Sequence, residues 1–134
     1  MPVMKHETIP IHSEADIVLS RQIVRKWATE IGFGLVDLTK IVTAASELAR
    51  NMVVYGGGGT LTLEALNEGI KRGLRLIFED QGPGIADIAL ALTDGYTTGK
   101  GMGLGLSGAK RLCNEFEINT EIGKGTRVMI ARWK

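Results

Sequence analysis

The sequence predicts an α+β fold: a two-layer sandwich with a mixed, mostly antiparallel sheet and helices on one face. Two pairs of strand-like segments, within 60–79 and 116–133, are each joined by a short connection, which is typical of antiparallel neighbours. Helical periodicity is confined to two segments before the first pair and one segment between the pairs. Helices and hairpins that are segregated in this way favour an α+β sandwich over an alternating α/β fold.

Length and composition set the outer limits of the interpretation. The chain has 134 residues, so we expect residues 1–134 to form a single domain. The one cysteine, Cys113, excludes an internal disulfide and favours a reducing, cytoplasmic setting. The N-terminus lacks the apolar stretch of a signal peptide, and no apolar run reaches the ~18 residues of a membrane helix. A net charge of +1 points to neither a nucleic acid nor a membrane as partner.

The first predicted elements are a short strand and a long helix. Residues 7–12 alternate weakly between polar and apolar, and Pro10 restricts such a strand to the edge of a sheet. Ser13 suits the N-cap of a helix that is expected to run to about Ile31. Glycine at position 32 is typical of the end of a helix.

The second helix has the clearest periodicity in the chain. We expect Asp37 to cap it and the glycines at 56–59 to end it. Its apolar residues recur at the helical period: Leu38, Ile41, Val42, Ala45, Leu48, Ala49, Met52 and Val53.

The remaining elements follow from alternation and from turn-forming residues. Strands are expected over 60–66 and 74–79, with a hairpin loop over 67–73. Beyond them we expect a loop over 80–85, a short helix over 86–92 and a mobile loop over 93–102. We then expect a third main helix over about 104–114 and two strands, over 116–121 and 126–133, joined by a Gly-Lys-Gly turn.

Glu47 and Asn51 form the first chemically informative pair. They lie four residues apart, so one helix stripe presents a carboxylate beside a carboxamide oxygen. This combination suits Mg²⁺, which takes one or two protein oxygens and leaves its other positions to water and phosphate. The carboxylate is also suited to accept a proton from a nucleophile. The structural alternative is a solvated glutamate with an ordinary asparagine near a helix end.

Two glycine-rich segments follow the predicted strands and loops. Asp80-Gln-Gly82-Pro-Gly84-Ile85 comes directly after a strand, where Asp80 can accept a hydrogen bond from an exocyclic amine and Ile85 can pack on a ring. A Pro-Gly turn capped by an aspartate is the structural alternative. Gly101-Met-Gly103-Leu104-Gly105-Leu106 opens a helix whose N–H groups can face a polyphosphate, with Lys100 adding positive charge.

Two other nucleotide motifs are rejected. Residues 103–108 match the spacing GxGxxG, but that motif requires a preceding strand and a βαβ unit. Residues 95–100 resemble a P-loop that is one residue short, and Gly101 stands where a serine or threonine is required.

Together, the motifs resemble the N, G1 and G2 boxes of the GHKL ATPase and kinase superfamily. The resemblance rests on Glu47-Leu-Ala-Arg-Asn51, Asp80-Gln-Gly-Pro-Gly84 and residues 101–106, in that order. Gly-Lys-Gly-Thr126 resembles a later box whose threonine contacts the adenine-binding aspartate. The resemblance covers about residues 38–131 and implies the Bergerat ATP-binding sandwich.

The resemblance also implies roles for individual residues. Glu47 would be the general base, Asn51 would ligate Mg²⁺, and Asp80 would bind the adenine amino group. Gly82, Gly84, Ile85 and Thr126 would shape the adenine pocket. Residues 86–102 would form a lid over the nucleotide. The phosphates would be held around the start of the third helix, by Lys100, Gly101, Gly103, Leu104, Gly105 and Leu106.

Chain length narrows the resemblance to the small bacterial serine/threonine kinases of partner-switching pathways. The stretches SELARN, EDQGPGI and GLGLSGAKRL carry this resemblance. It implies ATP and Mg²⁺ as cofactors, STAS-domain proteins of the stressosome type as phosphoryl acceptors, and the regulatory region of a PP2C-type phosphatase as a second partner. Two alternatives remain open: an anti-sigma factor whose kinase activity releases it, and a nucleotide-gated activator with negligible catalysis.

Overall fold

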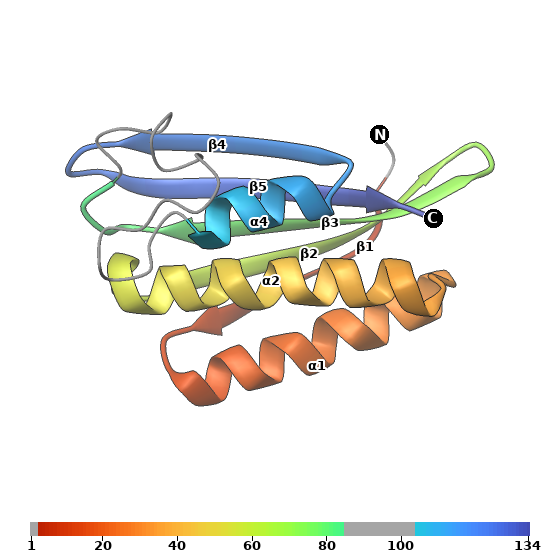
Figure 1. Cartoon of the computed structure of the whole chain (residues 1–134), viewed down its shortest axis with the longest axis horizontal. Coiled ribbons are helices and arrows are strands. Elements are labelled where there is room, and N and C mark those ends of the chain that lie inside the picture. The colour runs from red at the N-terminus through yellow and green to blue at the C-terminus, as the bar shows by residue number, and fades with distance from the viewer. Residues whose placement is uncertain (1–2, 85–103) are drawn as a thin grey trace.

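The protein is a two-layer α+β sandwich in a computed structural model that describes residues 3–84 and 104–134 (Figure 1). The five strands have the order β1-β2-β3-β5-β4. Every neighbouring pair is antiparallel, so the described sheet contains no parallel pair. The fold class predicted from the sequence is therefore confirmed. The described elements, in chain order, are β1 (Val3–Ile11), α1 (Glu14–Ile31), α2 (Leu35–Gly56), β2 (Gly59–Glu68), β3 (Lys71–Asp80), α4 (Leu104–Leu112), β4 (Glu115–Glu121) and β5 (Gly125–Trp133).

Strand β1 forms one edge of the sheet, as Pro10 predicted. It is longer than the predicted strand over 7–12, because it pairs with β2 from Val3 onward. Most side chains of β1 are exposed, and only Ile9 and Ile11 are buried. The weak alternation in the sequence therefore reflects a strand that contributes little to the core.

Helix α1 has the boundaries that its capping residues predicted. The Ser13 Oγ accepts a hydrogen bond from the Asp16 backbone N–H at 3.2 Å, which satisfies one free donor of the first turn. Gly32 ends the helix with φ of 103°, a left-handed conformation that favours glycine. Between these caps, Val24 and Trp27 point into the core.

The prediction that Asp37 caps α2 is wrong. Gly34 occupies the N-cap position and makes no side-chain hydrogen bond, while Asp37 lies in the first turn. The Asp37 carboxylate instead accepts a hydrogen bond from Arg132 of β5 at 2.5 Å. This guanidinium lowers the pKa of Asp37 below its ordinary value.

The first hairpin has a much shorter turn than the predicted loop over 67–73. Strands β2 and β3 continue in register to the pair Glu68 and Lys71, which leaves only Gly69 and Ile70 between them. In Figure 1 this hairpin extends beyond the helices. Its polar side chains have no helix layer to pack against, which explains why their composition resembles that of a loop.

Helix α4 packs beside α2 on the sheet, and it ends at Leu112 rather than near residue 114. The backbone N–H of Asn114 already donates to Ala131 of β5, which begins the connection to β4. Cys113 lies at this junction, half-buried, and burial raises the pKa of its thiol to about 11. The predicted helix over 86–92 and loop over 93–102 lie outside the described residues.

The core lies between the sheet and the helix layer. Inward residues of the central strands, such as Leu63, Leu76 and Ile130, are fully buried against the apolar stripes of α1 and α2. In the described part of the chain, no helix has the length and apolar character needed to cross a bilayer.

Ile130→Ala is expected to destabilise the fold by about 2–5 kcal/mol, because Ile130 is fully buried and its truncation leaves a cavity. Ile70→Ala is the matched control: the same change at an exposed turn should stay within about 0.5 kcal/mol. Urea unfolding followed by circular dichroism measures both values. Equal losses for the two variants would contradict the assignment of the core.

Candidate functional site

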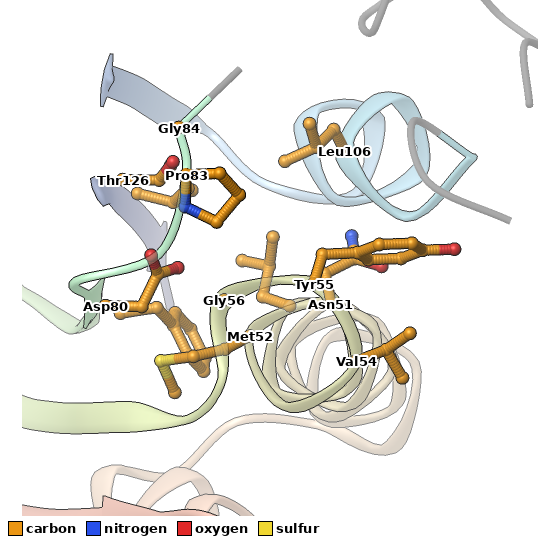
Figure 2. Close-up of a pocket in the computed structure, with 13 residues that line it drawn as sticks. Asn51, Met52, Val54, Tyr55, Gly56, Asp80, Pro83, Gly84, Leu106 and Thr126 are labelled. Atoms are coloured by element: carbon orange, nitrogen blue, oxygen red, sulfur yellow. The ribbon is translucent and has the colours of Figure 1, made fainter. Parts of the chain in front are cut away.

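A cavity of about 280 Å³ lies between the C-terminal part of α2, the ends of the central strands and the start of α4 (Figure 2). Its surface is largely apolar, with contributions from Met52, Phe78 and Val128. Five residues that the sequence predicted as nucleotide contacts line it together: Asn51, Asp80, Gly84, Leu106 and Thr126.

Asp80 is the carboxylate of this cavity and the last residue of β3. Its Oδ1 accepts a hydrogen bond from the Gly82 backbone N–H at 2.9 Å, so the loop after the strand orients the side chain. On the other side, the carboxylate lies against Gly56 at the end of α2. A Cβ added to Gly56 would be only 2.5 Å from the Asp80 Cγ, so no larger residue fits there without displacing the carboxylate.

Thr126 lies directly opposite Asp80 in the pairing of β3 with β5. Its hydroxyl lies 2.9 Å from that of Thr120, and these two residues are also opposite each other, in the pairing of β4 with β5. Pairing between three neighbouring strands therefore brings the threonine of the last motif to the aspartate of the second motif, although 46 positions separate them in the chain.

Asn51 and Tyr55 form the wall opposite Asp80 (Figure 2). The Asn51 Nδ2 and the Tyr55 hydroxyl are both buried, and neither has a hydrogen-bond partner among the described residues. A buried N–H donor without a partner, such as the Asn51 Nδ2 in this wall, suits an acceptor atom of a bound ligand. Tyr55 has no predicted role from the sequence, although its position one turn after Asn51 is a usable signal.

Glu47 lies one turn before Asn51 on α2 and is exposed to solvent. Glu47 does not line the cavity, unlike Asn51.

Helix α4 contributes Leu106, which is buried and points into the cavity from the side opposite to α2 (Figure 2). The backbone of Leu104 and Gly105 forms the first turn of this helix. Four other predicted contacts lie outside the described residues: Ile85, Lys100, Gly101 and Gly103.

The cavity has the chemistry of an adenine nucleotide site. Apolar side chains suit the faces of a purine ring, and one carboxylate suits its exocyclic amine. The unpaired Nδ2 of Asn51 suits an acceptor oxygen of the nucleotide, and the carboxamide oxygen of the same side chain is of the ligand type that Mg²⁺ prefers. The described residues contain no group of three or more histidine, cysteine, aspartate or glutamate side chains arranged to hold a metal.

Gly56→Ala is expected to weaken ATP binding by roughly tenfold or more, because the new methyl group displaces the Asp80 carboxylate. Gly108→Ala is the matched control, since Gly108 is also helical and no atom lies within 4 Å of its added Cβ. Calorimetric titration with Mg·ATP measures both affinities. If the two variants bind ATP equally well, the contact between Gly56 and Asp80 does not shape the site.

Comparisons with known proteins agree with this geometry. Residues 36–134 match the family described as histidine kinase-, DNA gyrase B-, and HSP90-like ATPase. The chain is 47% identical over 125 residues to the serine/threonine-protein kinase RsbT of Bacillus subtilis, covering 93% of this chain and 94% of that protein. It is 28% identical over 120 residues to an anti-sigma F factor of Thermoanaerobacter, covering 85% and 82% of the two chains.

A solved structure of the RsbU and RsbW domains of a Mycobacterium tuberculosis protein shares the fold, with a TM-score of 0.63 and 22% identity. The match covers 98% of this chain and 33% of that longer one. The chain therefore belongs to the histidine kinase-, gyrase B- and HSP90-like ATPases, and within them to the serine/threonine-protein kinases related to RsbT.

Proposed function

We propose that this chain, as a single domain over residues 1–134, transfers the γ-phosphoryl group of Mg·ATP to a serine or threonine hydroxyl. The acceptor is a STAS-domain protein of a stressosome-type partner-switching pathway in the cytoplasm. One observation carries the proposal: Asp80, Thr126, Asn51 and Leu106 meet in one cavity, in a chain that is 47% identical to a serine/threonine-protein kinase.

In this proposal, the nucleotide base lies at the Asp80 end of the cavity. Asp80 accepts a hydrogen bond from the adenine amino group, and Gly82 holds the carboxylate in place. Gly84, Ile85 and Thr126 shape the rest of the base pocket. The phosphates lie toward the start of α4, because the positive end of the helix dipole favours negative charge. The residues assigned to them are Lys100, Gly101, Gly103, Leu104, Gly105 and Leu106.

Asn51 and Glu47 are assigned to the reaction itself. The Asn51 carboxamide oxygen would ligate Mg²⁺, and the ion would neutralise part of the phosphate charge. Glu47 accepts the proton of the acceptor hydroxyl as that oxygen forms its bond to the γ-phosphorus. The bond from the γ-phosphorus to the bridging oxygen breaks, and its electron pair leaves with ADP. Positions 47 and 51 on one helix stripe keep these two functions adjacent.

A second partner is proposed for the state in which the kinase is not engaged with its acceptor. This partner is the regulatory region of a PP2C-type phosphatase, which the chain activates on binding. The alternative function is an anti-sigma factor that inhibits an alternative sigma factor. The 28% identity to an anti-sigma F factor favours it, and the higher identity to a kinase not named for sigma binding favours the main proposal.

ATP is expected to bind at least roughly a hundredfold more tightly than GTP. Guanine places a carbonyl oxygen where adenine has its amino group, and this oxygen would face the Asp80 carboxylate without a hydrogen bond. Competition of each nucleotide against a fluorescent ATP analogue measures the ratio. Equal affinities for ATP and GTP would remove Asp80 from base recognition.

Glu47→Gln is expected to lower the rate of phosphoryl transfer by roughly a hundredfold or more while ATP affinity stays near that of the unmodified protein, because the amide cannot accept the proton. Glu30→Gln, a change at another exposed helical glutamate, is the control. Intact masses of STAS-domain partners after incubation with Mg·ATP measure the transfer. Unchanged transfer by the Glu47→Gln variant would refute the role of Glu47 as the base.

A further inference from the structure

Helices α2 and α4 lie side by side and run in opposite directions (Figure 1). At one end of this pair, Asn51 and Tyr55 of α2 face Leu106 of α4 across the cavity (Figure 2). At the other end, the first turn of α2 lies near the last turn of α4, and both are bonded to one side chain of β5. The relative axial position of the two helices therefore determines how the α4 side of the cavity faces its α2 wall.

Arg132 is the side chain that joins the two helices. Its Nη1 donates to the backbone carbonyl of Leu112 at 2.7 Å, and its Nη2 donates to Asp37 Oδ1 at 2.5 Å. The Arg132 side chain is only 13% exposed and Asp37 is 40% exposed, so water competes little for the arginine. The rigid, planar guanidinium fixes both partners at once, which a lysine cannot do.

The charges along this chain of contacts alternate in sign. The N-terminus of α2 carries partial positive charge and faces Asp37 of its own first turn. Asp37 contacts Arg132, and Arg132 contacts a carbonyl at the negative C-terminus of α4. Each group thus lies next to one of opposite sign, and the Arg132 guanidinium lowers the pKa of the Asp37 carboxyl below its ordinary value.

Helix α4 is short, and the bond from Arg132 acts on its last residue. It has nine residues, and its buried apolar side chains, Leu106 and Ala109, are modest in number. Leu112 and Leu106 are six residues apart, or roughly 9 Å along a helix, and a helix transmits a displacement over that length as a rigid body. A displacement of the Leu112 carbonyl along the helix axis therefore also displaces Leu106 and the first turn of α4.

We propose that Arg132, held by Asp37, is a positioning residue for the nucleotide site: it fixes α4 against α2 so that the first turn of α4 stands at the right distance from Asn51. This inference rests on the proposed nucleotide site and adds a determinant at the opposite end of the helix pair. Arg132 does not line the cavity and touches no reacting group.

The test compares Arg132→Met with Arg75→Met. Methionine is chosen because it retains much of the apolar stem of arginine and removes the hydrogen bonds and charge of the guanidinium. Arg75 is a close match: its Nε bonds Glu64 at 2.5 Å, and both side chains are mostly buried, at 24% and 18% exposed. Glu64 and Arg75 pair directly across β2 and β3, and neither contacts α4 in a hydrogen bond or ion pair of the described chain. Loss of either arginine therefore removes a comparable ion pair.

Mg·ATP affinity is measured by calorimetry at a temperature at which circular dichroism shows every variant folded. Arg132→Met should raise the dissociation constant for ATP roughly tenfold, and Arg75→Met should leave it within about twofold. Asp37→Asn removes the charge of the outer contact, retains the shape and an acceptor oxygen of the side chain, and should give an intermediate increase of roughly threefold. This milder variant decides the question if Arg132→Met fails to fold.

Steady-state kinetics with a STAS-domain acceptor provide the second readout. A positioning defect weakens the binding of ATP equally in the ground state and in the transition state. KM for ATP should therefore rise while kcat at saturating ATP stays within about twofold. Equal effects of Arg132→Met and Arg75→Met on ATP affinity would reduce Arg132 to a general stabiliser and overturn the inference. Failure of the unmodified protein to bind ATP would instead refute the nucleotide site on which the inference rests.

Discussion

The close approach of α2 to the end of β3 is the constraint on which the site depends. Gly56 lies against the Asp80 carboxylate with no space for a side chain between them. On the neighbouring strand, a Cβ at Gly125 would overlap the carbonyl oxygen of Asp80, so β5 also meets this residue backbone to backbone. Asp80 is thereby held by three segments of main chain, and its carboxylate has little freedom to turn away from the cavity.

The same contact places the rest of α2. Once Gly56 is fixed against β3, the preceding turns of a straight helix lie at set heights above the sheet, which brings Asn51 and Tyr55 to the far wall of the cavity. At the other end of the helix, Asp37 and Arg132 determine where α4 lies beside it. The cavity is therefore defined by a backbone contact at one end of α2 and a charged contact at the other.

Local rules predicted much of this arrangement. The apolar period of α2, the caps Ser13 and Gly32, and the edge position forced by Pro10 all act within a few residues, so each was visible in the sequence. The role of Asp37 was not visible in this way, because its partner Arg132 is 95 residues away and competes with the local capping rule. Tyr55 was missed for a different reason: an aromatic residue at helical spacing usually indicates packing rather than an unpaired hydroxyl.

The motifs predicted which residues line the site, but neither the strand pairing that brings them together nor the exposure of each side chain. The resemblance of their motifs to the ATPase and kinase superfamily assigned Asn51, Asp80, Leu106 and Thr126 to one site, and they line one cavity. The pairing that places Thr126 opposite Asp80 depends on the strand order β3-β5-β4, which hairpin signals alone do not determine. Glu47 was paired with Asn51 by spacing, yet it is exposed while Asn51 is half-buried, a difference that depends on which elements cover the helix.

The half-buried Cys113 has a consequence for the chemical reactivity of the protein. With a thiol pKa of about 11, only a very small fraction of this side chain is thiolate at neutral pH, so alkylating reagents and peroxides react with it slowly. Cys113 lies where α4 joins β4, beside the carbonyl that Arg132 holds. Its slow reaction therefore makes the single native cysteine a poor site for attaching thiol-directed labels next to α4.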